Sequence, residues 1–384
     1  MVAVSGRALA AAAGRAGYAP AVIDLFGDRD TRALAPGGVA VAGSLARGFG
    51  RHALLAAAET LAPTGGLVYG AGFEARPGLL AALAHGRRLL GNTPETLSRI
   101  KDPAAFFTLL DRLGIPHPAV ALRRPAAPAG WLAKRVGGAG GVHVRPAEAA
   151  SGTGPLRRSA SEASRRYYQR RVEGRAVGAL FLADGRRARL LGLSEQWPAP
   201  DGAARPYRFG GAARPAAIGR RAAREIAAAI GALVRDTGLV GLNSLDMMVD
   251  GDDFLVLEVN PRPGATIDIF DAAPGLFGLH VAACAGRLKR GWRAPAGAAA
   301  SAIAYADRPL RIGAAVRWPR WSADRPAAGS RIAPGEPVCT VLVRARSATA
   351  ARARAGERVA AVLAALGGDA ARPRSKELDS CAHP

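Results

Sequence analysis

Residues 241–269 read GLNSLDMMVDGDDFLVLEVNPRPGATIDI, and this stretch decides how the chain is interpreted. The 384-residue chain holds only three asparagines, and two of them, Asn243 and Asn260, lie here beside Asp246 and Glu258. Chance explains such clustering poorly. The stretch is therefore expected to form a functional site.

The stretch has the pattern of a β-hairpin. Two apolar-rich runs are separated by Asp-Gly-Asp-Asp at residues 250–253, which is the composition of a tight turn. Side chains two positions apart share one face of a strand, so Glu258 and Asn260 should point the same way. The expected register places Asp246 opposite Glu258 and Ser244 opposite Asn260. The other face is expected to hold the apolar side chains of Leu245, Met247, Leu255, Leu257 and Val259.

Two carboxylates and an amide on one face predict a divalent metal site. Magnesium prefers oxygen ligands, and a site with few protein ligands leaves positions for water and phosphate. Asp246, Glu258 and Asn260 are therefore predicted to hold Mg²⁺ or Mn²⁺ together with a nucleotide. The alternative is a surface hairpin with solvated acids, which the rigid continuation Pro-Arg-Pro-Gly at residues 261–264 disfavours.

The order and spacing of Asp246, Glu258, Asn260 and Arg262 resemble the signature of the ATP-grasp superfamily of carboxylate-amine ligases. In that family the acids and the asparagine hold magnesium against the ATP phosphates, and the arginine contacts the reacting acyl phosphate. The resemblance implies ATP and Mg²⁺ as cofactors and a catalytic role for Arg262. It also implies an α/β (α+β) chain with the ATP-grasp fold, an N-terminal Rossmann-like pre-ATP-grasp domain and a small β-rich C-terminal domain.

Lysine usage gives a second indication of a nucleotide. Only four of the 53 basic residues are lysines, so exchangeable cations in this chain have become arginine. A lysine that persists is expected to do what arginine cannot, such as present a compact charge to a phosphate. Lys134, in a strand-like run, and Lys101, before a helical run, resemble the family's nucleotide-binding lysines, although Lys101 alone could be a solvated helix cap. The loop after Lys134 resembles the family's phosphate loop, which closes with backbone N–H groups, here through Gly137, Gly138, Gly140 and Gly141.

Residues 166–175, RYYQRRVEGR, resemble the hinge strand that receives adenine and ribose in the family. Backbone groups of the hinge would pair with the adenine edge. Glu173 is the expected partner of the ribose hydroxyls, unless it is only an exposed turn residue. Many family members carry an acid soon after the glutamine, where this chain has two arginines. The hinge positions expected to bind the nucleotide are Gln169, Arg170, Arg171, Val172 and Glu173.

Two further residues are expected to face substrate. Arg208 lies in a segment rich in arginine, aromatic residues and glycine, and could hold a carboxylate through a bidentate pair, unless it is only surface charge. We include Arg208 with Arg262 as catalytic. Glu74 follows an expected strand end, where α/β sheets usually place ligands. It is a candidate for binding an amine substrate, with a cap or surface acid as the alternative.

The chain is expected to contain several domains. Alternating strands and helices over residues 1–95 predict a small parallel sheet. Residues 96–290 would form the ATP-grasp domain, as two subdomains with a hinge near residues 167–175. A small β-rich domain would cover residues 291–366, followed by a disordered tail at residues 367–384.

Composition limits the class of protein. With 49% hydrophobic residues the chain can bury a sizeable core. Its net charge of +23 would ordinarily indicate nucleic-acid binding, but the arginines are spread along the chain and only 5% of residues are aromatic, so no nucleic acid is expected. No apolar run approaches the roughly 20 residues of a membrane span, so no membrane partner is expected. Three scattered cysteines, and Arg15 soon after the first alanine run, favour the cytoplasm over secretion.

The resemblance implies an ADP-forming ligase that joins a small-molecule carboxylate to an amine, and it leaves room for a homodimer. Residues 257–268, with the Gly-Phe-Glu and Tyr-Arg-Phe-Gly-Gly segments, are similar to ATP-grasp proteins of one-carbon metabolism in methylotrophs and to tyramine-glutamate ligase. Glutamate or another amino acid, in synthesis of a methanofuran-type cofactor, is the corresponding substrate hypothesis. The alternatives are a bicarbonate-using carboxylase of the purine-synthesis type and a non-catalytic nucleotide-binding protein.

Overall fold

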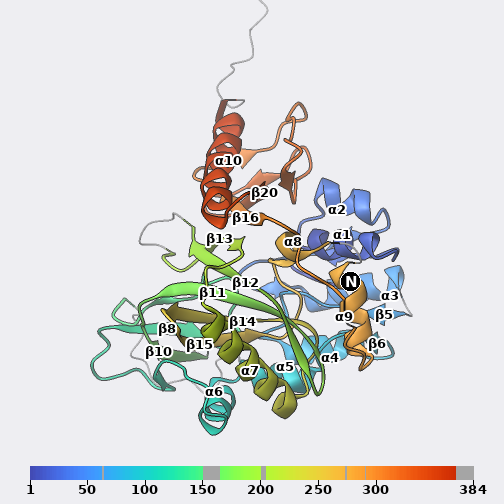
Figure 1. Cartoon of the computed structure of the whole chain (residues 1–384). Coiled ribbons are helices and arrows are strands. Elements are labelled where there is room, and N and C mark those ends of the chain that lie inside the picture. Colours follow the sequence, from blue (N-terminus) through green and yellow to red (C-terminus); the bar gives the residue numbers. More distant parts are fainter. Residues whose placement is uncertain (63–64, 150–164, 200–204, 273–274, 290, 369–384) are drawn as a thin grey trace, which may run out of the picture.

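An antiparallel sheet of long strands forms the centre of the protein (Figure 1). This computed structural model describes the whole chain except residues 63–64, 150–164, 200–204, 273–274, 290 and 369–384. The expected disordered tail thus lies almost entirely outside the described residues. The strand order is β15-β14-β11-β12-β13-β16-β20-β18. The strands are β11 (Arg175–Asp184), β12 (Ala188–Pro198), β13 (Phe209–Arg214), β14 (Val240–Asp250), β15 (Asp253–Asn260), β16 (Ala298–Tyr305), β18 (Ser322–Ala323) and β20 (Pro337–Ala345).

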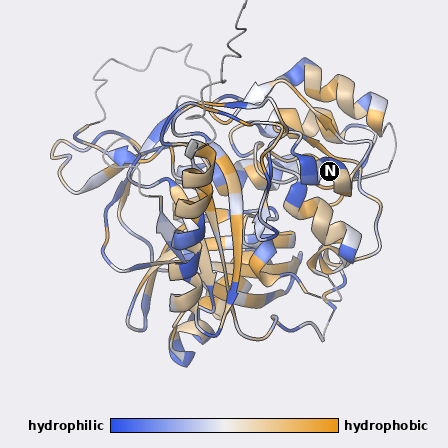
Figure 2. Ribbon diagram, turned by 90° about the horizontal axis from the view of Figure 1, so that it is seen from above, coloured by the Kyte–Doolittle hydropathy of each residue, from blue (hydrophilic) through white to orange (hydrophobic). Residues whose placement is uncertain are grey.

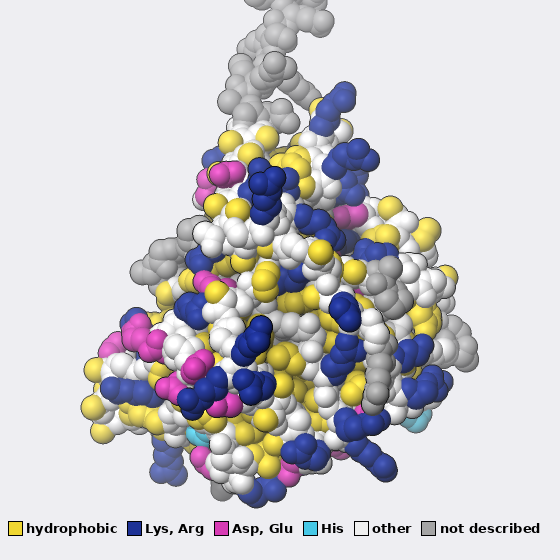
Figure 3. All heavy atoms as spheres, viewed as in Figure 1, with side chains coloured by type: hydrophobic (Ala, Val, Ile, Leu, Met, Phe, Trp, Pro, Cys, Tyr) yellow, Lys and Arg dark blue, Asp and Glu magenta, His cyan; other side chains and the backbone are white. Residues whose placement is uncertain are grey.

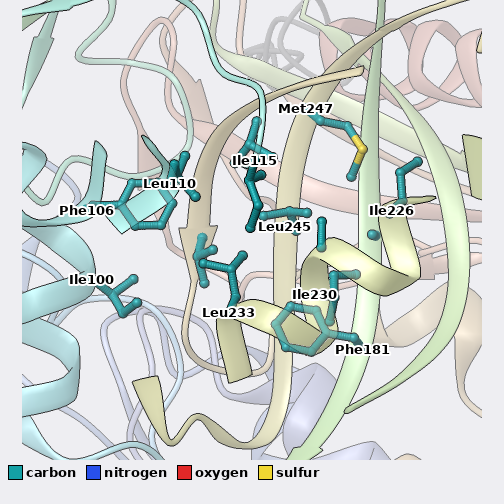
Figure 4. Close-up of a cluster of buried hydrophobic side chains, with 14 of the residues drawn as sticks. Ile100, Phe106, Leu110, Ile115, Phe181, Ile226, Ile230, Leu233, Leu245 and Met247 are labelled. Carbon is teal, nitrogen blue, oxygen red and sulfur yellow. The ribbon is translucent and has the colours of Figure 1, made fainter. Parts of the chain in front are cut away.

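Helices cover both faces of this sheet because β11 is buried on both sides. Its residue Phe181 packs in one apolar cluster with α7, while the neighbouring Leu180 and Leu182 pack in another with α1, α8 and α9. In Figure 4, side chains of α7 point toward Phe181 and toward residues of β14. Hydrophobic residues accordingly gather on the central strands in Figure 2. The helices are α1 (Arg7–Arg15), α7 (Arg220–Thr237), α8 (Ile267–Phe270) and α9 (Leu276–Cys284).

The N-terminal part contains the expected parallel strands in short form. Val2 bridges in parallel to both Ile23 and Tyr69, β1 pairs with β2, and β5 pairs with β6. The chain enters α1 directly after Gly6, where an added Cβ would lie 2.3 Å from Val22. The elements are β1 (Ile23–Asp24), α2 (Arg29–Leu34), β2 (Val39–Ala40), β3 (Gly43–Ser44), β4 (Gly48–Phe49), α3 (Arg51–Leu61), β5 (Gly66–Leu67), α4 (Pro77–Ala84) and β6 (Arg88–Leu89).

A second antiparallel sheet lies between these two parts in the sequence. Its strand order is β7-β10-β8-β9, and two consecutive helices precede it. The residue expected at the start of a helix, Lys101, is instead the last residue of one helix and stands just before the next. The elements are α5 (Pro94–Lys101), α6 (Pro103–Arg112), β7 (Val120–Ala121), β8 (Trp131–Arg135), β9 (Arg145–Pro146) and β10 (Arg166–Arg170).

The C-terminal part continues the central sheet. β16 pairs with β13 on one side and with β20 on the other, so the sheet runs on past the linker. Helix α10 (Ala348–Gly368) packs on β16 and β20, at the top of Figure 1. The short strands β17 (Leu310–Arg311) and β19 (Arg331–Ile332) pair beside it. The domain boundaries stay a prediction, because the sheet spans the boundary expected near residue 290.

Basic side chains are dispersed over the surface. On the face shown in Figure 3, Lys and Arg lie among hydrophobic and acidic groups without forming one continuous stripe. Helices of the described residues are all too short or too polar to cross a membrane.

The contact between α7 and the sheet should dominate stability. Leu233 is fully buried on α7, whereas Arg235, two residues later, is exposed. Replacing Leu233 by alanine leaves a cavity, so we expect a loss of about 2–5 kcal/mol in the free energy of unfolding. The matched control Arg235→Ala should change it by less than about 0.5 kcal/mol. Urea unfolding measures both, and equal effects would contradict the assigned core face.

Candidate active site

The β14–β15 hairpin places the expected metal ligands side by side. Asp246 pairs with Glu258 and Ser244 with Asn260, which is the predicted register. The amide of Asn260 donates to Oδ2 of Asp246 at 2.8 Å. Two carboxylates and an amide therefore meet on one face of the sheet, as the two-residue period requires.

A bulge in this hairpin makes one sequence prediction wrong. Asp246 pairs with Glu258, but the next residue, Met247, pairs with Val256, so Leu257 is the extra residue of β15. An extra residue exchanges the two faces of a strand beyond it. Phe254 and Val256 therefore enter the core with Val259, whereas the expected Leu255 and Leu257 do not. Leu257 instead lines the same cavity as the predicted metal ligands.

Lys101 stands against the acidic pair. Its Nζ donates to Oε2 of Glu258 at 3.1 Å and to Oδ1 of Asn260 at 2.9 Å. Burial alone would raise the pKa of Glu258, but the charges of Lys101 and Lys134 outweigh it and hold that pKa below its usual range. Lys101 is thus engaged with the site, which excludes the solvated-cap alternative.

Asp246 is the carboxylate of the pair whose pKa is raised. Burial and then the neighbouring charge of Glu258 raise its pKa. The side chain of Gln196 on β12 donates to Oδ1 of Asp246 at 2.9 Å and opposes that shift. The sequence interpretation did not include Gln196. It could have been found by rarity, because Gln196 and Gln169 are the only two glutamines in the sequence.

Arg262 is held by Glu74 from the N-terminal part. Its Nε donates to Oε1 of Glu74 at 2.8 Å, and both side chains are almost entirely buried. Burial would raise the pKa of Glu74, but Arg262 and Lys101 outweigh it and lower that pKa. Glu74 also accepts a hydrogen bond from the backbone of Gly72. Its carboxylate therefore orients Arg262, and each of its two oxygens already accepts a hydrogen bond.

A buried amide pair supports the same segment from below. Asn92 donates to Oδ1 of Asn243 and to the carbonyl of Pro261, each at 2.8 Å, and accepts from the backbone of Val240 at 2.8 Å. The hydroxyl of Tyr69 also donates to the Pro261 carbonyl, at 3.2 Å. These contacts fix the backbone one residue before Arg262. Asn92 is the third asparagine of the chain and was missed because it lies far from the hairpin in sequence.

Lys134 lies beside the hinge glutamine. Its Nζ donates to Oε1 of Gln169 at 2.9 Å, and both side chains are buried. Burial alone would lower the pKa of Lys134, but Tyr167 and Glu258 outweigh it and raise that pKa, so the ammonium stays charged. Within the described residues, the buried Nε2 of Gln169 has no acceptor. A hydrogen-bonding ligand at this point would satisfy it.

The hinge backbone is partly used by the protein itself. The N–H of Arg170 donates to Ala119 and that of Arg171 to Gly130. Pairing with an adenine edge would therefore fall to the backbone of Val172 and Glu173. The Glu173 side chain is 88% exposed and pairs with the half-exposed Arg171 at 3.2 Å, so it lies at the rim.

The glycine-rich loop packs between two other segments of the chain. Gly137 and Gly141 have positive φ angles, and an added Cβ would lie 2.5 Å from the Glu74 carbonyl oxygen and 1.8 Å from that of Tyr207, respectively. Only glycine fits such positions. At Gly138 the obstacle is the ring of His143, whose pKa burial lowers to about 4.

Arg208 is buried, which excludes its reading as surface charge. Its guanidinium donates to the carbonyl of Gly335 at 2.8 Å and stacks 3.6 Å from the ring centroid of Tyr305. These contacts fix the arginine against the C-terminal part. A carboxylate partner for it stays a prediction.

One cavity of about 2060 Å³ unites the predicted residues. All of them line it except Lys101 and Gly138. Lys101 is connected to the cavity lining through its hydrogen bonds to Glu258 and Asn260. Among the described residues, no group of three or more His, Cys, Asp or Glu side chains is arranged so that it could hold a metal ion. The oxygen donors available to a hard cation are therefore two carboxylates and the Asn260 amide. This set fits Mg²⁺ or Mn²⁺ shared with phosphate oxygens.

Comparison with known proteins agrees with this geometry. Residues 100–266 match the family model described as ATP-grasp domain. The chain is 26% identical over 206 residues to the large chain of carbamoyl phosphate synthase from Rubrobacter xylanophilus, an alignment that covers 50% of this chain. That alignment spans only 19% of the relative's length.

Two solved structures resemble nearly the whole chain. The biotin carboxylase domain of 2-oxoglutarate carboxylase from Hydrogenobacter thermophilus has a TM-score of 0.70 at 13% identity and covers 92% of this chain and 87% of its own. The N5-carboxyaminoimidazole ribonucleotide synthetase of Thermus thermophilus has a TM-score of 0.64 at 19% identity and covers 95% of this chain and 98% of its own. At such identities the likeness concerns the fold.

The chain therefore has the ATP-grasp fold, and residues 100–266 carry the match to the ATP-grasp domain. The expected ATP-grasp fold is confirmed, and it extends over more of the chain than the residues that match the family model.

The buried asparagine pair gives a test of the site's support. In Asn92→Ala the Pro261 carbonyl, the Asn243 amide and the Val240 N–H lose a partner, so we expect a loss of about 3 kcal/mol or more in the free energy of unfolding. The neighbouring Thr93 is exposed and caps α5 by accepting from the backbone N–H of Thr96, and Thr93→Ala should cost about 1 kcal/mol. If urea unfolding shows a smaller loss of unfolding free energy for Asn92→Ala than for Thr93→Ala, the Asn92 hydrogen bonds do not stabilise the fold as proposed.

Proposed function

We propose that the protein is an ATP-dependent, ADP-forming ligase that activates a carboxylate as an acyl phosphate and joins it to an amine. One observation carries the proposal. The oxygen donors of the β14–β15 hairpin face the same cavity as Lys134 and Gln169, with Lys101 bonded to two of those donors. A bound nucleoside triphosphate requires an acidic face that holds its metal ion and a lysine that neutralises its phosphates.

The nucleotide would bind at the end of the cavity that the hinge residues line. Lys134 would neutralise phosphate oxygens, and the unpaired Nε2 of Gln169 would donate to the ligand. The backbone of Val172 and Glu173 would meet the adenine edge. The glycine-rich loop would cover the phosphates with its N–H groups.

Asp246, Glu258 and Asn260 would hold Mg²⁺ or Mn²⁺, which when bound supplies charge neutralisation at the phosphates. The Hydrogenobacter carboxylase domain is in complex with MgADP, which supports the same cofactor here. Lys101 would turn from the acids toward the phosphates once a metal takes its place. Lys101 thus keeps the acidic pair compensated before the nucleotide arrives.

The chemistry at Arg262 would proceed in two displacements. A substrate carboxylate oxygen attacks the γ phosphorus and ADP leaves. The amine nitrogen then attacks the acyl carbon, phosphate leaves and the nitrogen loses a proton. Arg262, fixed by Glu74, stabilises the negative charge that develops on the acyl phosphate and the tetrahedral intermediate. Arg208 would bind the carboxylate side of the substrate.

A second candidate is a bicarbonate-using carboxylase. The similar structures favour it, because the Hydrogenobacter domain is in complex with bicarbonate and the Campylobacter jejuni protein of similar fold is a biotin carboxylase. Glutamate or another amino acid in one-carbon cofactor synthesis rests only on the resemblance of residues 257–268. Bicarbonate-dependent ATP turnover without an amine would favour the carboxylase.

A screen of ATP turnover tests the proposed reaction. We expect ADP and phosphate to form only when a carboxylate and an amine are both present, drawn from amino acids, glutamate and aromatic amines. Product analysis by chromatography measures the nucleotide. Formation of AMP and pyrophosphate would contradict an acyl phosphate, and ATP binding without any turnover would indicate a non-catalytic protein.

Removing a metal ligand should abolish the reaction without unfolding the protein. Because a metal supplies several kcal/mol of charge stabilisation, Asp246→Ala and Glu258→Ala should each lower kcat by roughly a hundredfold or more. The control Asp252→Ala changes an exposed acid in the turn of the same hairpin and should leave kcat unchanged. Undiminished activity in either ligand variant would falsify the metal site.

A further inference from the structure

One end of the cavity is acidic although the protein carries a net charge of +23. Asp28, Asp268 and Asp324 line this end, together with Ser5 and Arg7. It lies where the N-terminal part meets the C-terminal part, since Asp30 accepts hydrogen bonds from the backbone N–H groups at residues 324 and 325. Two segments nearly 300 residues apart in sequence thus lie side by side at this end of the cavity.

Most acids at this end already have partners. Arg7 donates to both oxygens of Asp268 and to both oxygens of Asp324. Asp324 also accepts from the hydroxyl of Ser5 at 2.9 Å. Asp24 accepts from the backbone N–H groups of residues 6, 26 and 27. Arg7 is therefore saturated by two carboxylates, and a second cation, Arg325, has its Nε 3.6 Å from Oδ2 of Asp30.

Asp28 is the exception. Only 5% of this residue is exposed, and it lines the cavity. It occupies the N-cap of α2, yet its side chain accepts no cap hydrogen bond. In the described part of the chain no donor bonds its carboxylate and no cation forms an ion pair with it. A charged carboxylate buried without a partner is costly, so this side chain would gain from a partner that the chain itself does not supply.

The neighbouring charges point to a missing cation. Burial, followed by Asp324, Asp24 and Asp30, raises the pKa of Asp28 to about 8, and the saturated Arg7 offsets only part of this. A positive group beside the carboxylate would reverse the shift. One open carboxylate suits a single ammonium, whereas a divalent metal would need further free oxygen ligands.

Apolar residues close to Asp28 in the sequence also line the cavity. Leu25 and Phe26 line the cavity just before Asp28, and Phe26 is 39% exposed. Every residue from Arg262 to Asp268 lines the same cavity, and Asp268 is bonded to Arg7. A ligand held at Asp28 therefore occupies the compartment that contains the reacting groups.

We propose that Asp28 is the anchor of an ammonium subsite that binds the amine substrate, with the nearby Leu25 and Phe26 as apolar lining of the same cavity. The subsite rests on the proposed function in that it assigns the amine of the ligase. It also replaces Glu74, the residue that the sequence suggested for the amine, because the Glu74 carboxylate is bonded to Arg262.

Equilibrium binding tests the subsite without requiring turnover. Phenethylamine and its uncharged match 2-phenylethanol are titrated into the full chain by calorimetry at pH 7. We expect the amine to bind the wild type at least ~10-fold more tightly than the alcohol, because a charge-assisted hydrogen bond is lost in the alcohol. Asp28→Asn should weaken amine binding ~10- to 100-fold and remove the preference, while Asp28→Glu should retain part of it.

The control Asp307→Asn makes the same change at an exposed carboxylate of the C-terminal part and should bind like wild type. Asp28→Asn should also unfold at the wild-type temperature or above, because Asp28 makes no side-chain hydrogen bond to lose. Equal binding of amine and alcohol, a preference that persists in Asp28→Asn, or displacement of the amine from wild type by Mg²⁺ alone would each overturn the subsite. Amine binding in a protein without ligase turnover would leave the subsite standing and contradict the proposed function alone.

Discussion

Asp246 and Glu258 face each other across two neighbouring strands, and the rest of the site is arranged around these two negative charges. Like charges directly opposite in a sheet repel, and burial strengthens the repulsion. Hydrogen-bond donors from three elements offset this repulsion. Lys101 comes from the end of α5, Gln196 from β12, and Asn260 from the hairpin itself. The acidic pair thus ties three separate elements together, and the same oxygens are available to a metal.

Amide side chains hold this arrangement because they donate and accept at once. Asn260 donates to a carboxylate and accepts from a lysine, and Asn92 donates to one carbonyl while accepting from a backbone N–H. No ionised side chain can do both. The whole sequence contains five amide side chains, and each of them is in or directly beneath the site. They are Asn92, Asn243, Asn260, Gln169 and Gln196.

The cavity is also divided by charge. Lysines and the hinge define one end for an anionic nucleotide, and carboxylates define the other, where Arg7 joins the N-terminal part to Asp268 and Asp324. Arg262 lies within the same wall and is fixed by Glu74. The proposed ligase would use this polarity, because its nucleotide and its amine would carry opposite charges and would be bound in one compartment.

The sequence by itself determined the hairpin and the grouping of its oxygen donors, because strand parity is a local property and Asp246, Glu258 and Asn260 lie within 15 residues of one another. Rarity likewise identified Lys101 and Lys134 against an arginine background. Local pattern could not reveal the bulge at Leu257, since one inserted residue leaves composition unchanged but exchanges the two faces. Local pattern also could not predict that Glu74 bonds to Arg262, 188 residues away, or that Asp28 has no side-chain cap hydrogen bond. Those features depend on which distant segments pack together, and only the tertiary structure decided them.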